Sequence, residues 1–351
     1  MISGESLVFI GFCIFILGIL FFDLKVVGRN SHVVSFKESI LWTSIWVSFA
    51  LGFYFLLYFF GEKLHGIENT EKLVEVTSKY AEKLLITGDF ASDIQAYRSK
   101  IAMEFITGYL VEYSLSIDNV FVIMMILSTF SVNEKYYKPV LFWGVLGAII
   151  LRFIFIFVGA ALIQKFAFIL YFFGGFLIFS GVKMFLGRNK NEKIDPQNHS
   201  IVKFLSKRLP IHPHYVEGKF SIKINSKHFF TPLFIVLVLV EFTDLIFAFD
   251  SIPAIFAITT DPYIVFFSNI FAIIGLRSLF FLLSKVVDLF RFLKVGISFL
   301  LVFIGIKLLF HSFLDDIGFE TKYSLYIILA TLIISILASI LIKEREKTES
   351  I

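Results

Sequence analysis

Two strongly apolar segments of this sequence carry acidic side chains. They read EYSLSIDNVFVIMMI at 112–126 and VEFTDLIFAFDSIPAIFAI at 240–258. An aspartate at the centre of a membrane helix costs roughly 2.5–3.5 kcal/mol, and acids in such positions usually mark ion or proton pathways. Carboxylate, amide and hydroxyl oxygens without cysteine or histidine are the ligands of hard divalent cations such as Mg²⁺, Ca²⁺ or Mn²⁺. The candidate metal-site residues are Glu112, Asp118, Asn119, Glu241, Asp244, Asp250 and Ser251.

One arginine follows each acidic segment. Arg152 lies in AIILRFIFIF and Arg277 in IIGLRSLFFL, and both are predicted to balance the charge of two of the acids. The alternative to a binding site is a purely structural role, in which acids and arginines form internal ion pairs. About three acids would then still lack a cationic partner. The residues leave open whether a metal ion binds to these carboxylates or a proton moves along them.

The elements that position these residues are predicted to be membrane helices. Of the 351 residues, 58% are hydrophobic and 18% aromatic, and the mean hydropathy is +0.85, above the range of soluble domains. A spanning helix needs about 20 apolar residues. We therefore predict an all-α polytopic membrane protein of about nine transmembrane helices, the first of them a retained span and not a cleaved signal peptide. The nine stretches are 6–27, 38–60, 102–130, 138–162, 164–187, 230–258, 263–287, 292–311 and 323–342.

The connections predict the orientation, because cytoplasmic loops carry an excess of Lys and Arg. Connections one, three, five and seven are basic, and the fifth holds nine cations between Arg188 and Lys227. The tail from Lys343 is expected on the same side. We therefore expect the N-terminus outside and the C-terminus in the cytoplasm. The basic fifth connection is explained as a topology signal beside the lipid bilayer, so no nucleic-acid partner is predicted.

The two acidic segments belong to a longer internal repeat of three helices. Spans three to five start outside and spans six to eight start inside, so the two units are predicted to be inverted across the membrane. In secondary transporters with such repeats, the substrate site lies near mid-membrane at the repeat interface. The aligned pairs are Glu112 and Asp244, Asp118 and Asp250, Asn119 and Ser251, Arg152 and Arg277, and Lys183 and Lys307.

The repeat divides the chain into six parts. The second part has an apolar spacing at Leu73, Val76, Tyr80 and Leu84 that favours a surface helix, with a solvated spacer as the alternative. The parts are an N-terminal two-helix hairpin (1–61), an extracytoplasmic connection (62–101), the first three-helix repeat (102–187), a basic cytoplasmic loop (188–229), the second, inverted repeat (230–311), and a final helix with the cytoplasmic tail (312–351).

Helical spacing predicts on which side of its helix each acid lies. Residues three, four or seven apart share a face, so Glu112 and Asn119 belong to one polar stripe. Asp118 follows Glu112 by six residues, which in an ideal helix turns it about 120° away and moves it about 9 Å along the axis. A straight helix would therefore spread these carboxylates. Because Pro253 removes a backbone hydrogen bond just after Asp250, we expect the second helix to unwind there.

Several other classes of protein find no support in the sequence. The single cysteine, Cys13, excludes disulfides, cysteine-rich metal sites and thiol catalysis as organising features. The seven histidines all fall in connections or at the edges of spans. The sequence contains no P-loop, nucleophile elbow or haem-ligand pair. We therefore predict that the protein is not an enzyme and holds no permanently bound cofactor.

Four long segments carry a resemblance to a known family. They are FDLKVVGRNSHVVSFKESILWTSIW (22–46), AMEFITGYLVEYSLSIDNVFVIMMI (102–126), TPLFIVLVLVEFTDLIFAFDSIPAIFAIT (231–259) and DPYIVFFSNIFAIIGLRSLFFLL (261–283). At these motifs the sequence resembles the TerC-like integral membrane proteins, which include the Alx proteins and fall within the LysE-type transporter group. The resemblance implies a bacterial inner-membrane protein associated with Mn²⁺ export and metal homeostasis, with tellurium resistance as a phenotype of some members. Tyr113, where many relatives have a lysine, and the long second connection depart from the pattern.

By this resemblance, the metal-site acids of the family map onto the five carboxylates above, with Asn119 and Ser251 as neutral helpers. Three hypotheses remain open. The first is proton-linked export of Mn²⁺ through the carboxylates. The second is a non-transporting scaffold in membrane-protein biogenesis or envelope stress, and the third is a channel or transporter for another divalent cation such as Ca²⁺. The expected partners of the first are a divalent cation, protons and the lipid bilayer.

Overall fold

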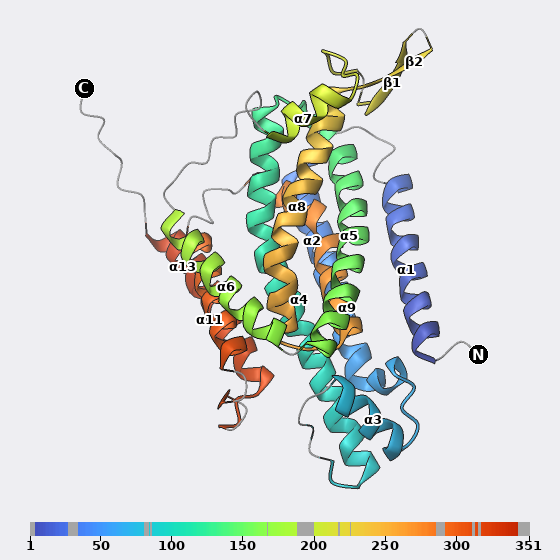
Figure 1. The fold of residues 1–351 in the computed structure, drawn as a ribbon, viewed down its shortest axis with the longest axis vertical. Helices are drawn as coiled ribbons and strands as arrows, with labels where there is room; N and C mark the ends of the chain where they lie inside the picture. Colours follow the sequence, from blue (N-terminus) through green and yellow to red (C-terminus); the bar gives the residue numbers. More distant parts are fainter. Residues whose placement is uncertain are drawn as a thin grey trace.

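The computed structural model is predominantly helical, with one two-stranded hairpin (Figure 1). The predicted class, an all-α polytopic membrane protein, is confirmed. The structure describes residues 4–26, 34–80, 84, 86–166, 168–187, 200–216, 218–224, 226–285, 292–310, 313–314 and 317–342. The expected basic tail from residue 343 and much of the fifth connection lie outside these ranges.

The helices follow one another as the apolar stretches predict, with short helices added in the connections. The helices of the apolar stretches are α1 (Gly4–Val26), α2 (Phe36–Phe60), α4 (Phe90–Thr129), α5 (Tyr137–Lys165), α6 (Phe168–Gly187), α8 (Pro232–Phe256), α9 (Pro262–Ile274), α10 (Leu276–Leu283), α11 (Leu293–Leu309) and α13 (Thr321–Leu341). The smaller elements are η1 (Gly61–Leu64), α3 (Thr70–Tyr80), η2 (Glu134–Tyr136), α7 (Ser200–Arg208), β1 (Ser221–Ile224) and β2 (Lys227–Phe230).

Six helices in the described ranges are long and apolar enough to cross a membrane, or seven if α9 and α10 form one bent span. The bend between α9 and α10 is 41° and falls at Gly275. The expected count of nine is not confirmed, because two of the helices are shorter than the about 20 residues that a span needs. Helix α11 has 17 residues, and the apolar part of α1 is Val8–Ile19.

Local signals explain where several helices begin. The Ser35 hydroxyl accepts from the backbone N–H of Glu38 at the start of α2, and Asp89 accepts from the N–H groups of Ala91 and Ser92 at the start of α4. Such caps satisfy donors that have no partner inside the helix. Prolines at the first helical position begin α8 and α9, where the missing N–H has no consequence.

The second connection contains the predicted surface helix. Helix α3 buries Leu73, Val76 and Tyr80, as their spacing predicted, whereas Leu84 follows the helix. Helix α4 begins already at Phe90, so it extends from the membrane into this connection. The α3 end of the bundle therefore carries a small helical cap (Figure 1).

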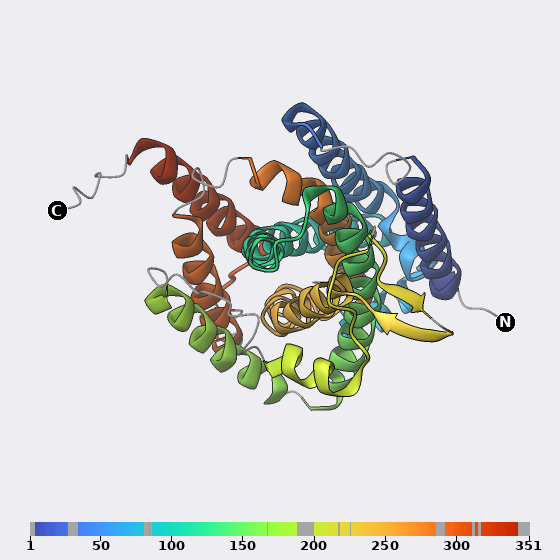
Figure 2. The ribbon, with the colours of Figure 1, turned by 90° about the horizontal axis from the view of Figure 1, so that it is seen from above.

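Helices α4 and α8 lie near the centre of the bundle (Figure 2). Helices α1 and α2 lie on one side of them, and α6, α11 and α13 form a group on the other (Figure 2). Helix α5 packs against α8 and α9, and α9 packs against α4. The hairpin and α7 lie at the end of the bundle opposite α3, which we call the α7 end (Figure 1). Each side of the α4–α8 pair thus faces a different set of helices.

The expected unwinding of the second acidic helix is wrong. Helix α8 continues through Pro253 to Phe256, and α4 is equally continuous through Asp118. A proline removes only one backbone hydrogen bond, here the one to the carbonyl of Phe249, and α8 stays helical on both sides of it. The carboxylates are consequently spread around two continuous helices.

Helices α6 and α11 cross antiparallel at small residues. A Cβ at Gly305 would lie 2.7 Å from the carbonyl oxygen of Gly174, and a Cβ at Gly181 would lie 2.7 Å from that of Ser298. Small residues allow this close approach of helices in membranes. In the predicted alignment Gly181 matches Gly305 and Gly174 matches Ser298, so the two contacts are reciprocal, the relation expected of an inverted repeat.

Candidate functional site

Polar side chains of α4 and α8 meet in the middle of the bundle. The Asn119 side-chain amide donates to Oδ1 of Asp244 at 2.8 Å. The Ser251 hydroxyl lies beside the Glu112 carboxylate. Because Asn119 matches Ser251 and Glu112 matches Asp244 in the predicted alignment, these contacts are also reciprocal. Two helices that are far apart in the sequence thus contribute equivalent groups to one site.

Arg152 of α5 binds the two central acids together. It forms ion pairs with Glu112 and with Asp244, the latter at 3.1 Å from Nη2 to Oδ1. Asn269 of α9 accepts from Nη1 of Arg152 at 2.9 Å, and its own amide donates to Oε2 of Glu112 at 3.0 Å. Four helices therefore supply one hydrogen-bonded network.

The network is almost completely buried. Glu112, Arg152 and Asp244 are 1%, 2% and 4% exposed, and Asn119, Ser251 and Asn269 are buried with them. Ions in such surroundings need partners, because their desolvation costs several kcal/mol each. Two carboxylates and one guanidinium leave one formal negative charge, so the network is only partly neutralised.

Asp118 and Asp250 lie on the opposite side of the α4–α8 pair. Oδ1 of Asp250 accepts from the Ser180 hydroxyl of α6 at 2.7 Å, and Oδ1 of Asp118 is 3.7 Å from Nζ of Lys294 in α11. Lys183 and Asp118 lie close enough to Asp250 to act on it electrostatically. The predicted rotation of about 120° thus separates the acids into two pairs: a central pair, Glu112 and Asp244, and a lateral pair, Asp118 and Asp250.

Glu241 belongs to neither pair. It packs against α5, where a Cβ at Gly147 would overlap its carboxylate. Its Oε2 is buried and has no hydrogen-bond partner among the described residues, and the same holds for Oδ1 of Asn119. These oxygens leave unused acceptor capacity at the site, which is uncommon for buried polar atoms.

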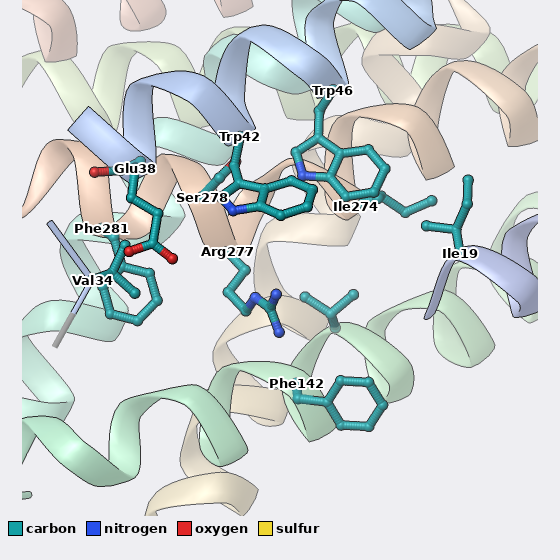
Figure 3. Close-up of a pocket in the computed structure, with 12 residues that line it drawn as sticks. Ile19, Val34, Glu38, Trp42, Trp46, Phe142, Ile274, Arg277, Ser278 and Phe281 are labelled. Carbon is teal, nitrogen blue, oxygen red and sulfur yellow. The ribbon is translucent and has the colours of Figure 1, made fainter. Parts of the chain in front are cut away.

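Arg277 occupies a pocket away from the five acids. The pocket lies between α2, α5 and α10 and is lined by Trp42, Trp46, Phe142 and Glu38 as well as Arg277 (Figure 3). Its volume is about 30 Å³, which is enough to hold at least one water molecule. The matched arginines of the two repeats therefore have different surroundings, and only Arg152 lies in the central network.

The seven candidate metal-site residues lie in the same region, but their acids do not converge on one point. In the described part of the chain, no three His, Cys, Asp or Glu side chains are placed to hold a metal ion together. The acids sit in a central pair, a lateral pair and a separate Glu241. Binding of a metal by several of these carboxylates would need movement of the helices or oxygens from water.

Sequence reasoning missed three contributors to the site. Asn269 is an amide within the apolar run IVFFSNIFAII and could have been noticed on that ground. Ser180 and Lys294 carry no comparable signal, because serines occur widely in membrane helices and Lys294 lies at a helix end. Their roles depend on how α6 and α11 pack beside α4 and α8.

Apolar spans around a buried network of acids, amides and one arginine define an integral, multi-pass membrane protein with ionisable groups in its interior. The chain belongs to the integral membrane protein TerC family, whose model matches residues 97–347. The predicted resemblance is thereby confirmed.

Related proteins match along most of the chain. An uncharacterized membrane protein of Myxococcus xanthus is 40% identical over 99% of this chain and 96% of its own length. The Alx protein of Salmonella typhi, whose name proposes the role of a membrane-bound redox modulator, is 41% identical over 88% of this chain and 87% of its own. The Alx protein of Escherichia coli K12 is 40% identical over 88% of each chain. No solved structure matches this chain.

Proposed function

We propose that this protein is a secondary transporter that exports Mn²⁺ in exchange for inward-moving protons, and so serves metal homeostasis. The observation that carries the proposal is the buried polar layer across α4 and α8, with carboxylates on both sides of the helix pair. A permanently ionised layer inside membrane helices is expensive. Oxygen ligands without cysteine or histidine suit a hard divalent cation.

The lateral pair is the place where the cation would bind. Asp118 and Asp250 face α6 and α11, across the boundary between the central bundle and the group of α6, α11 and α13. Lys294 contacts Asp118 only at 3.7 Å and is 44% exposed, so a metal ion can compete with it. Carboxylates that hold the cation when ionised would release it when they are protonated. Exchange of the cation for protons then needs no cofactor and no enzymatic step.

The central pair has a different role in this proposal. Arg152 fills the space between Glu112 and Asp244 and joins four helices through Asn269 and Asn119. The arginine acts as a fixed counter-cation that keeps the layer intact while the lateral site is empty. Movement of the two repeats against each other would then expose the lateral acids to one side of the membrane at a time.

The proposal includes the cell membrane as the location and an orientation. The first turn of α1 and helix α3 lie at one end of the bundle, and the hairpin and α7 lie at the other (Figure 1). Lys203, Lys207 and Arg208 are placed at the α7 end with further lysines of the hairpin. The excess of cations puts this end in the cytoplasm of a bacterial cell, beside the inner membrane surface. Tellurium resistance would be a secondary phenotype of metal handling.

A scaffold role is the second candidate, and the central network favours it. Arg152 already pairs with two acids, so part of the polar layer is explained by internal ion pairs alone. The name of Alx proposes a redox role, but thiol redox chemistry would have a single candidate residue in this sequence, Cys13. Transport of another hard cation such as Ca²⁺ remains the third candidate, since the oxygen ligands suit it equally.

The test is Mn²⁺ efflux from cells that express the wild type, Asp118→Asn or Asp250→Asn at matched membrane abundance, with and without a collapsed proton gradient. We expect efflux only from the wild type and only with the gradient. Glu75→Gln, a change of an exposed acid on α3, serves as the control and should transport normally. Equal efflux from all variants and from empty membranes would refute Mn²⁺ export, and parallel Ca²⁺ measurements would then separate another cation from a scaffold.

A further inference from the structure

The hairpin of β1 and β2 projects from the α7 end of the bundle, toward the side of α5 and α1 (Figures 1 and 2). Side chains alternate between the two faces of a strand, and residues paired across two strands share a face. Ile224 pairs with Lys227, and Ile222 pairs with Phe229. One face of the hairpin therefore carries three apolar side chains with a lysine at the tip, and we call it the apolar face.

The opposite face of the hairpin is polar along most of its length. It carries Ser221, Lys223 and His228, which are all exposed. Phe230 also belongs to this face, but it lies at the root of the hairpin and packs against Phe234 of α8, with the ring centroids 4.4 Å apart. The projecting part of the hairpin is thus amphipathic.

The described part of the chain leaves the apolar face partly open. Ile224 is 40% exposed, and Ile222 and Phe229 are partly exposed. Neither of the two apolar cores formed by the described residues includes any of the three. Because a two-stranded hairpin alone is only marginally stable in water, contact with an apolar phase outside the chain would stabilise it.

The root of the hairpin is fixed to the start of α8. The backbone N–H of Thr231 donates to the carbonyl of Phe220 at 3.0 Å, and its hydroxyl donates to the carbonyl of Lys219 at 2.6 Å. The next residue, Pro232, begins α8, so the root lies where the chain enters the membrane. Since a strand advances about 3.3 Å per residue, β2 keeps the tip within about 13 Å of this point.

Cations dominate this end of the protein. Between residues 200 and 230 the sequence contains six Lys or Arg and one acid, Glu217. The cations are Lys203, Lys207, Arg208, Lys219, Lys223 and Lys227. In α7, Phe204 is 59% exposed, and Cζ of Arg208 lies 5.4 Å from the centre of its ring. Exposed apolar side chains beside cations are typical of segments that lie in the headgroup layer of anionic membranes.

We propose that the apolar face of the hairpin lies in the headgroup layer of the membrane and binds anionic lipids there. Ile222, Ile224 and Phe229 contact the upper part of the acyl chains, and Lys227 extends from the tip to lipid phosphates. A nucleic acid would pair with the cations but leave the apolar face in water. The inference goes beyond the proposed transport function and does not depend on it, because it rests on the hairpin and the membrane spans alone.

Fluorophores at adjacent positions on opposite faces test this placement. In a Cys13→Ser background, Ile224→Cys labels the apolar face and Lys223→Cys labels the polar face of the full-length protein. The protein is reconstituted in nanodiscs of equal parts phosphatidylglycerol and phosphatidylcholine. We expect nitroxide-labelled lipids to quench the label on the apolar face about threefold more than the other label, and acrylamide, which quenches from the water, to show the reverse order. This preference should disappear in phosphatidylcholine alone and in high salt, which screens the charges.

Hydrogen exchange of the unlabelled protein is the second measurement. Amides of β1 and β2 should exchange about threefold more slowly with phosphatidylglycerol than without it, because the lipid suppresses local opening of the hairpin. Ile224→Ser should abolish this slowing, whereas Ser221→Ala, on the polar face, should keep it.

Several results would overturn the proposal. They are equal lipid quenching of the two labels, a preference that is unchanged in phosphatidylcholine alone, and slowed exchange that survives Ile224→Ser. Protection of both labels from acrylamide without lipid quenching would assign the surface to a protein partner, and protection only after addition of RNA would assign it to a nucleic acid. Either of these outcomes would also refute binding to lipid.

Discussion

The two sides of the α4–α8 pair carry the same kinds of acid in different surroundings. On the side of α5 and α9, Arg152 binds both Glu112 and Asp244 in a fully buried network. On the side of α6 and α11, Asp250 accepts a hydrogen bond from the Ser180 hydroxyl, and Asp118 lies near the exposed Lys294. Under the proposed transport function, the central pair would serve stability and the lateral pair ion exchange, so that one layer of charge would both hold helices together and bind an ion.

The largest effect on stability is expected when the arginine of the central network is replaced. Arg152→Met leaves Glu112 and Asp244 buried without a counter-charge, and removal of one partner of a buried ion pair costs about 3–5 kcal/mol. We expect a strong loss of membrane abundance and of thermal stability in detergent. Addition of Glu112→Gln and Asp244→Asn to Arg152→Met should restore part of the stability. Arg277→Met, in the small separate pocket, should have a clearly smaller effect, and equal losses would remove the difference between the two arginines.

A second prediction concerns the helices that complete the lateral side. Gly305→Ala places a Cβ 2.7 Å from the carbonyl oxygen of Gly174, and such overpacking typically costs about 1–3 kcal/mol. We expect α6 and α11 to separate, which should reduce Mn²⁺ efflux and increase proteolysis between them. Gly175→Ala is the matched control, because no atom lies within 4 Å of its Cβ. Unchanged efflux in Gly305→Ala would show that the lateral acids do not depend on this crossing.

Another buried carboxylate, Asp261, lies beside a histidine, and this pair can be compared with the acids of the α4–α8 layer. Nε2 of His65 is 3.3 Å from Oδ2 of Asp261, and Nδ1 is 3.0 Å from the Tyr97 hydroxyl. Burial, followed by the charges of Lys72 and Lys79, lowers the pKa of His65 from 6.5 to about 4. Below pH 6.5 the unfolded segment binds a proton that the folded one does not, so local stability rises as the pH increases from about 4 to 6.5.

This pH dependence is confined to the cap around α3. Between pH 6.5 and 4, each unit of acidification should increase the opening of this cap up to about tenfold, measured as hydrogen exchange of α3 amides. The groups that face His65 are Lys72, Lys79 and Tyr80 of α3, Tyr97 of α4, and Asp261 with Tyr263 of α9. His65→Gln should flatten the profile, and exchange in α4 around Glu112 should not follow it. A steep profile in the variant would assign the effect to another group.

The smallest effect on stability is expected from the lateral acids themselves. Asp118→Asn and Asp250→Asn remove a partly exposed ion pair and one hydrogen bond from Ser180, which together are worth roughly 1 kcal/mol or less. Their thermal unfolding in detergent should therefore stay close to that of the wild type while Mn²⁺ efflux is lost. If Asp250→Asn destabilises the protein as much as Arg152→Met, the lateral pair is structural as well.

The sequence predicted much of the site before any contact was known. The apolar stretches located the helices, and the pairing of α4 with α8 followed from the matched acidic segments. The rotation between Glu112 and Asp118 was predicted from helical spacing, and it holds because both helices are continuous. The expectation that Pro253 would unwind α8 was wrong, since the loss of one backbone hydrogen bond does not interrupt the helix, which continues to Phe256.

What the sequence determined by itself is local: the apolar spans, the caps of α2 and α4, the acids that must be compensated, and the family to which the chain belongs. Only the tertiary structure decided which charges meet. Arg152 and Arg277 occupy matching positions in the sequence, yet one joins two acids and the other lies in a separate pocket. The physical reason is that side-chain periodicity specifies the direction in which a residue points from its own helix, whereas its partner depends on which helix packs against that face.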